Sequence, residues 1–188
     1  MSPIWMQTAS GRKATPSRLE ASEISVEDIA HHLGNLCRWT GACRYFYTVA
    51  QHCVLVSEAL TQRENRPDLA IYGLLHDASE AYTNDINSPL KYSPEMMGFR
   101  YVERRAEDAI LSAFDLTPLS PEDLAIIKRV DLRMMATEAI TFGLMKPLHP
   151  DWVLEEQPYK DHAIPWFWYP FEARQRWLDR FNLLMVGR

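Results

Sequence analysis

Three shortages in this sequence limit what the protein can be. The cysteines Cys37, Cys43 and Cys53 are odd in number and form no Cys-x-x-Cys pair, which indicates reduced thiols in the cytoplasm. No apolar run is long enough to cross a membrane, and the N-terminus lacks the pattern of a signal peptide. We therefore expect a cytoplasmic protein without a membrane partner.

Positive charge is also scarce. The chain has 20 Lys and Arg residues against 25 Asp and Glu residues, a formal net charge of -5, and no long basic run. Proteins that bind a polymer of phosphates neutralise it with such runs, so we expect no nucleic-acid polymer as a partner. A small phosphate ligand remains compatible, because one or two arginines in a pocket suffice for it.

Glycine is scarce as well, with 7 residues, while Ala, Leu, Met, Glu and Arg dominate the periodic stretches, a composition that favours helices. A chain of 188 residues fits one domain, and the 47% of hydrophobic residues allow a large core. We predict a single all-α domain, a helical bundle with a short N-terminal hairpin or arm. Its parts are the arm (1–24), the helical core (25–145), a Pro/Trp-rich loop (146–170) and a C-terminal helix (171–188).

Capping signals and apolar spacing predict where the helices lie. The first begins at Ser25 and runs into Cys37-Arg38-Trp39, before Thr40-Gly41 ends it. The central helix begins at Pro67 and stops near Thr83. Further helix starts stand at Thr48, Ser93 and Ser120.

Two regions are predicted to face solvent or a partner. The charged residues from Glu103 to Glu107 are predicted to lie on a solvent-exposed helix face. Residues 146–170 contain five prolines and cannot form one helix. The aromatic cluster 166–169 is expected on a loop that packs on the body of the protein or on a partner subunit, and an exposed Trp166 and Trp168 would suit an interface. The histidines outside the central motifs are expected to be solvated: His31, His32, His149 and His162.

The stretch from Leu74 to Tyr82 places polar groups inside an apolar helix. His76, Asp77 and Glu80 stand among leucines and alanines, so they lie at the edge of a core or within it. An ionised Asp in such a place costs several kcal/mol unless something pairs with it. A divalent metal ion would provide that pairing.

Polar residues interrupt apolar helix faces at three separate places: His52, His76-Asp77 and Asp131. Taken alone, His76-Asp77 reads as a helix-end salt bridge, His52 as a hydrogen-bonded core histidine and Asp131 as a solvated carboxylate. Their joint occurrence favours a site of two imidazoles and two carboxylates. Such a set suits a borderline or hard divalent ion with positions left open for water and substrate.

The order of these residues resembles the HD-domain metal-dependent phosphohydrolase superfamily. Longer blocks resemble the bacterial YfbR-type 5'-deoxynucleotidases and extend to small phage HD hydrolases, including the DatZ-type dATP triphosphohydrolases. The blocks that carry the resemblance are Arg38-Trp39, Val49-Ala50-Gln51-His52, His76-Asp77-Ala78-Ser79-Glu80, Thr83-Asn84-Asp85, Ser88-Pro89-Leu90-Lys91-Tyr92 and Lys128-Arg129-Val130-Asp131.

The resemblance implies roles for these residues. His52, His76, Asp77 and Asp131 would hold a divalent metal, with Co, Mn, Mg, Ni and Zn all compatible. Glu80 and Asp85 would carry protons, Arg38 would orient the phosphate, and Trp39 would exclude a 2'-hydroxyl by shape. The substrate-binding set is Arg38, Trp39, Asp77, Asp85, Ile86, Asn87, Ser88 and Lys91.

Simpler roles remain open for several of these residues. Glu80 can be a surface carboxylate near a helix end, Arg38 a helix-end arginine and Trp39 a plain core tryptophan. Solvated side chains are the default reading for Lys91, Arg44 and Arg100.

The favoured function is a 5'-deoxynucleotidase that converts a dNMP to deoxynucleoside and phosphate. The alternative is a dNTP triphosphohydrolase that releases deoxynucleoside and triphosphate by the same chemistry. A hydrolase of cyclic nucleotides or guanosine tetraphosphate is a further enzymatic rival, and a nucleotide-sensing or structural metal-binding protein is the non-enzymatic one. The resemblance also implies a homo-oligomer, either a dimer or a larger ring.

Overall fold

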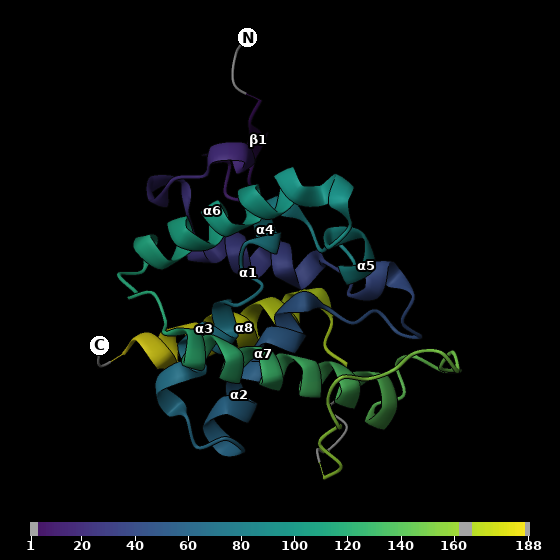
Figure 1. Cartoon of the computed structure of the whole chain (residues 1–188). Helices are drawn as coiled ribbons and strands as arrows, with labels where there is room; N and C mark the ends of the chain where they lie inside the picture. Colours follow the sequence, from purple (N-terminus) through teal and green to yellow (C-terminus); the bar gives the residue numbers. More distant parts are fainter. Residues whose placement is uncertain (1–3, 162–166, 187–188) are drawn as a thin grey trace.

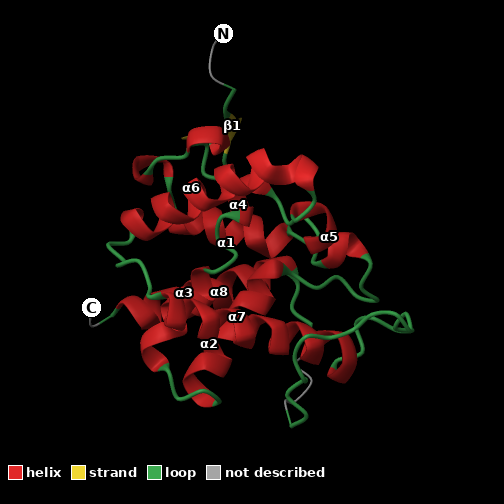
Figure 2. Ribbon diagram, in the orientation of Figure 1, coloured by secondary structure: helices red, strands yellow, loops and turns green. Residues whose placement is uncertain are grey.

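The computed structural model of the chain describes residues 4–161 and 167–186. It is mostly helical, with a short antiparallel hairpin near the N-terminus (Figures 1 and 2), which confirms the predicted fold class. The strands are β1 (Met6–Gln7) and β2 (Lys13–Ala14). The α-helices are α1 (Val26–Asn35), α2 (Val49–Gln62), α3 (Ala70–Leu75), α4 (Glu80–Thr83), α5 (Ser88–Lys91), α6 (Met97–Ala113), α7 (Pro121–Ala136) and α8 (Pro170–Met185). The short 3₁₀ helices are η1 (Pro16–Arg18), η2 (Ala21–Glu23), η3 (Trp39–Gly41), η4 (Pro67–Leu69) and η5 (Pro94–Met96). A π-helical turn, η6 (Thr137–Thr141), follows α7.

Helix α2 is central to the packing of the bundle. It contacts α1, α3, α7 and α8, and most of its side chains are buried. Helix α6 lies on another side, where it covers α4, α5 and the η1 and η2 turns of the arm (Figure 1). Because α2, α3 and α7 contact one another, polar residues from these three helices can meet at one point inside the core.

Hydroxyl caps begin three of the predicted helices. The side chains of Ser25, Thr48 and Ser120 accept hydrogen bonds from backbone N–H groups in the first turns of α1, α2 and α7. A cap of this kind satisfies an N–H group that has no partner within the helix and contributes about 1 kcal/mol. The starts predicted at Ser25, Thr48 and Ser120 are therefore confirmed.

The predicted end of the first helix is wrong. Helix α1 stops at Asn35, because Leu36 is extended and the next residues pair with the segment before α2. The Val49 N–H donates to Leu36 O at 3.0 Å, and the Arg38 N–H donates to Tyr47 O at 2.9 Å. This backbone pairing places Arg38 and Tyr47 opposite each other.

The central helix is also not continuous. It begins with the η4 turn, α3 ends at Leu75, and α4 starts only at Glu80. Between them the Ala78 N–H donates to Leu75 O, and the Glu80 N–H donates to Asp77 O, so the chain tightens to three-residue hydrogen bonds. The metal-candidate pair His76-Asp77 thus lies on a turn between two helices.

Several residues expected at the surface are partly or fully buried. Glu103 is buried and binds Lys91, with 2.7 Å between its Oε1 and the lysine Nζ. Trp168 is 8% exposed and belongs to the main hydrophobic cluster, and its backbone N–H donates to Gln51 Oε1. His32 is half-buried: its Nδ1–H donates to Ala81 O at 2.7 Å, and its Nε2 accepts from the Ala9 N–H.

Other surface expectations have different outcomes. His149 is exposed as expected, whereas Trp166 and His162 lie outside the described residues. The described parts of 146–170 before α8 contain no helix, as the prolines predict. Within the described chain, none of the helices combines the length and apolar character needed to cross a membrane.

A glycine sets how closely α1 approaches α8. A Cβ at Gly34 would lie 2.9 Å from Pro170 O, whereas a Cβ at Gly98, in the first turn of α6, would meet nothing within 4 Å. Gly34→Ala should lower the free energy of unfolding by about 1 kcal/mol or more, because overpacking outweighs the helix preference of alanine. Gly98→Ala should raise it by about 0.5–1 kcal/mol. Urea unfolding measures both, and a Gly34→Ala variant as stable as Gly98→Ala would contradict the close approach.

Candidate metal and phosphate site

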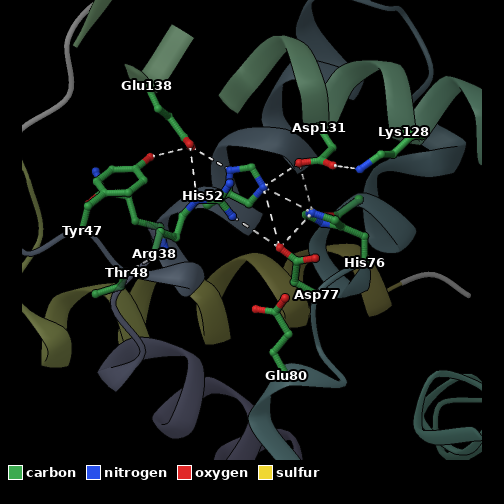
Figure 3. Close-up of polar contacts among 12 residues, drawn as sticks. Arg38, Tyr47, Thr48, His52, His76, Asp77, Glu80, Lys128, Asp131 and Glu138 are labelled. Atoms are coloured by element: carbon green, nitrogen blue, oxygen red, sulfur yellow. Dashed lines mark hydrogen bonds and ion pairs between the residues drawn. The ribbon is translucent and has the colours of Figure 1, made fainter. Parts of the chain in front are cut away.

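Two imidazoles and two carboxylates meet where α2, α3 and α7 converge (Figure 3). His52 Nε2 lies 3.3 Å from His76 Nε2 and 3.1 Å from Asp131 Oδ1. Asp77 Oδ2 lies 3.2 Å from His76 Nε2 and 3.8 Å from His52 Nε2. The structure thus brings together all four residues that the sequence marked as ligands.

These separations fit a shared divalent ion. Nitrogen and oxygen ligands about 2.0–2.2 Å from one ion lie roughly 3–3.6 Å apart, close to the distances found here. The ligand atoms of His52, His76 and Asp131 lie within 4.8 Å of one another, as do those of Cys53, His76 and Asp77. Burial raises the pKa of the Cys53 thiol to about 11, which keeps it protonated and makes Asp131 the better ligand.

Hydrogen bonds to the other ring nitrogens orient both imidazoles. His52 Nδ1 lies 2.7 Å from Glu138 Oε1, and His76 Nδ1 lies 2.8 Å from Gly73 O. When each Nδ1 carries the proton and donates it to these oxygens, each Nε2 keeps a lone pair directed at the site. This tautomer is the one that a metal ligand requires.

The ionisation of the two aspartates also suits the binding of a cation. Burial by itself raises the pKa values of Asp77 and Asp131, but the two histidines lower both below the usual range of aspartate. Lys128 Nζ lies 2.8 Å from Asp131 Oδ2 and contributes further positive charge. Both carboxylates are therefore ionised at neutral pH and available as ligands.

Arg38 lies beside the ligand set rather than at a solvated helix end. Its Nη1 is 3.5 Å from Asp77 Oδ2, and its Nε is 3.4 Å from Glu138 Oε2. Burial lowers the pKa of Arg38, but Glu138, Asp77 and Asp131 raise it above the usual value, so the guanidinium keeps its charge. Trp39, with φ of 52°, lies under that guanidinium, 5.1 Å from ring centroid to Cζ.

Glu80 approaches the site from α4, with its carboxylate pointing toward Asp77 (Figure 3). It is 5% exposed, and its Oε2 has no hydrogen-bond partner among the described residues. Burial and the charges of Asp77 and Asp85 raise the pKa of Glu80 well above its usual value. Lys91 Nζ, 3.9 Å from Glu80 Oε1, partly offsets this. A buried carboxyl that holds its proton at neutral pH can serve as a general acid.

The predicted substrate loop is only partly near these groups. Asp85 is half-buried, and burial raises its pKa above the usual value. The positive charge of Arg38 acts in the opposite direction, so Asp85 lies close enough to interact with Arg38 electrostatically. Asn87 is exposed and caps α5 by accepting from the Leu90 N–H at 3.1 Å. Ile86 is half-buried and Ser88 is exposed. The roles assigned to Ile86, Asn87 and Ser88 stay predictions.

Two residues of this cluster were not found from the sequence: Glu138 and Tyr47. Glu138 accepts from the Tyr47 hydroxyl at 2.9 Å, and both side chains are fully buried. A signal for Glu138 did exist, because it follows Asp131 by seven residues, two helical turns, and stands among small and apolar residues. Nothing in the sequence around Tyr47 distinguishes it from an ordinary core tyrosine.

A cavity of about 180 Å³ opens next to the ligands. It lies between α3, α6 and α7 and is lined by His76, by Glu107 and by apolar side chains such as Leu75 and Ile127. Glu107 itself is exposed. Of the four metal candidates, His76 therefore borders open space.

Comparison with known proteins gives a family for the chain. The model of the family described as 5'-deoxynucleotidase YfbR-like matches residues 46–135. That span holds the four ligand candidates and Glu80, whereas Arg38 and Glu138 lie outside it.

Two curated relatives share much of the sequence. The uncharacterized protein YfdR of Escherichia coli (strain K12) is 34% identical over 140 residues, which are 74% of this chain and 73% of that protein. An uncharacterized protein of Rhodobacter capsulatus is 35% identical over 122 residues, 62% of this chain and 59% of that protein. With its candidate metal ligands in place, the chain belongs to the YfbR-like 5'-deoxynucleotidase family of HD-domain phosphohydrolases.

Proposed function

We propose that the protein is a metal-dependent 5'-deoxynucleotidase that hydrolyses dNMPs to deoxynucleoside and phosphate. The observation that carries this proposal is the meeting of three parts at one place: the His2Asp2 set, the charged Arg38 and the buried acid Glu80. A divalent ion held by the four ligands supplies Lewis-acid polarisation of the phosphoryl group and makes water more acidic.

The protein's own groups divide the remaining work. Arg38 binds the phosphate oxygens with its terminal nitrogens and keeps the phosphorus in line for attack by water. The bond between phosphorus and the 5'-oxygen breaks as the bond to the water oxygen forms. Glu80 donates its proton to the departing 5'-oxygen and recovers one from the attacking water, with Asp85 as a second carrier. The Trp39 ring excludes a 2'-hydroxyl by occupying the space beside the sugar.

The basic side chains near the site are already engaged by other groups, which supports a monophosphate substrate over a triphosphate. Lys91 is paired with Glu103, and Arg100 donates to the backbone oxygens of Lys91 and Ser93. Lys128 is paired with Asp131 at 2.8 Å. A longer phosphate chain would require cations that are not already engaged. Triphosphate release from dNTPs remains the second candidate, since it uses the same chemistry at the first phosphorus.

We also propose a homo-oligomer, on the strength of the resemblance to HD hydrolases. The buried position of Trp168 removes one of the two side chains expected at the interface. Light scattering coupled to size exclusion tests this proposal directly, and a monomer at micromolar concentration would refute it.

The substrate is tested with a panel of nucleotides. Purified protein loaded with Co²⁺, Mn²⁺, Mg²⁺, Ni²⁺ or Zn²⁺ should release phosphate from dNMPs and spare the ribonucleotides, if Trp39 has the proposed role of excluding a 2'-hydroxyl. Chromatography and phosphate assays follow both products. Release of tripolyphosphate from dATP without cleavage of dAMP would replace the first candidate with the second. A silent panel with bound metal would favour the non-enzymatic alternative.

Glu80→Gln tests the proposed acid. Because a positioned acid contributes about 10²–10⁴-fold to rate, the variant should lose at least 10²-fold in kcat. Its Mn²⁺ affinity should change little, since Glu80 is not among the ligand atoms. Glu58→Gln is the matched control, because burial also raises the pKa of that carboxyl while it lies near Arg180 and Arg176 instead. Full activity in Glu80→Gln would remove Glu80 from the mechanism.

Metal affinity should fall as the pH falls. Burial lowers the pKa of His76, but Asp77 and Asp131 raise it well above its usual value, so metal binding must displace a proton from His76. Titration calorimetry with Mn²⁺ at pH 6, 7 and 8 should give the weakest binding at pH 6. Buffers of different ionisation enthalpy should reveal proton release. An affinity independent of pH would argue against histidine ligands.

A further inference from the structure

Glu138 is as deeply buried as His52 and more deeply buried than His76, Asp77 and Asp131. Its side chain has no exposed surface, and it sits in the π-helical turn η6 that continues α7. A π turn widens the helix by one residue and is frequent at functional sites. An ionised carboxylate in such a position requires several charged or hydrogen-bonding partners.

The two oxygens of Glu138 serve different halves of the site (Figure 3). Oε1 accepts from His52 Nδ1–H at 2.7 Å and from the Tyr47 hydroxyl at 2.9 Å. Oε2 faces Arg38 Nε at 3.4 Å. One carboxylate thus contacts a candidate metal ligand and the arginine proposed to bind phosphate.

The contact between Arg38 Nε and Glu138 Oε2 is an ion pair without a hydrogen bond. Both Arg38 Nε and Glu138 Oε2 are buried, and neither has a hydrogen-bond partner within the described chain. The pair is attracted as ions, but its alignment is too poor for the N–H to donate. A small rotation of the guanidinium would align the Nε–H with Glu138 Oε2 and complete the bond.

We propose that Glu138 is a positioning residue that couples metal binding to phosphate binding. It fixes the His52 ring with Nε2 toward the ligand set, and it draws Arg38 Nε inward so that the terminal nitrogens face the substrate. The proposal rests on the proposed function for the identity of the phosphate, but its metal arm depends only on the His2Asp2 set.

Tyr47 holds the carboxylate in place for this task. Its hydroxyl donates to the oxygen that His52 also uses, and the backbone pairing of Tyr47 with Arg38 ties the two segments together. Burial and the neighbouring Glu138 charge raise the pKa of Tyr47 well above its usual value, so the hydroxyl keeps its proton and remains a donor. Glu138 is thus held by His52 on α2 and by Tyr47 in the extended segment before α2.

The experiment compares two carboxylates with similar surroundings. Glu64 also accepts from a tyrosine, Tyr159 at 3.0 Å, and pairs with Arg129 at 2.9 Å and Arg133 at 3.3 Å, but it contacts none of the ligand candidates. Glu138→Gln and Glu64→Gln each replace a partly or fully buried carboxylate by an amide. Both should lower thermal stability, whereas only Glu138→Gln should affect the site.

Two readouts separate positioning from stability. In Glu138→Gln, Mn²⁺ affinity measured by calorimetry should fall roughly 10-fold or more, as expected when a metal-bound histidine loses its carboxylate partner. KM for a dNMP should rise together with that loss, and Glu64→Gln should keep both values. Tyr47→Phe, which retains the Glu138 charge, should give a smaller loss of Mn²⁺ affinity and provides the test if Glu138→Gln does not fold.

A double-mutant cycle tests the coupling itself. Arg38→Gln, Glu138→Gln and the double variant are titrated with Mn²⁺, and the two effects should deviate from additivity by at least threefold. Additive effects, or an unchanged Mn²⁺ affinity in Glu138→Gln and Tyr47→Phe, would overturn the proposal. Absence of dNMP turnover in the wild type would refute the proposed function alone, because the Mn²⁺ titrations would still decide the role of Glu138.

Discussion

The need to balance buried charge governs how this site is built. Asp77, Asp131 and Glu138 bring three carboxylates to the edge of a core whose neighbours are almost all apolar. Arg38 and the two histidines provide part of the balance, and most of the short polar distances in Figure 3 join an acid to a base or to a hydroxyl. Because unpaired ions are so unfavourable in such surroundings, the removal of one member disturbs all the others.

The backbone places these groups where its helices are interrupted. Helix α1 ends so that residues 36–38 can pair with 47–49, the central helix breaks between Leu75 and Glu80, and α7 widens into the π turn. Each interruption sets a polar side chain at an angle that a continuous helix would not allow. A uniform bundle would hold the same residues on separate faces, so the irregular segments carry the function and the regular helices carry the stability.

The sequence predicted the ligands better than their surroundings. His52, His76-Asp77 and Asp131 could be found because each interrupts an apolar face, and periodicity detects such interruptions. The break before Glu80 and the early end of α1 follow from hydrogen bonds to distant segments, which periodicity does not report. Glu138 was missed because it neither begins a motif nor interrupts a predicted helix, although its spacing from Asp131 held the information.

The proposal of a monophosphate substrate rests on the same balance of charge. Two acids at the site are paired with lysines: Glu103 binds Lys91, and Asp131 binds Lys128. Arg38 lies beside the metal candidates, with its Nη1 3.5 Å from Asp77 Oδ2. One guanidinium can hold one phosphate in a bidentate manner, whereas two further phosphates would have to break existing ion pairs. The arrangement of charge is therefore the argument for the proposed monophosphate substrate.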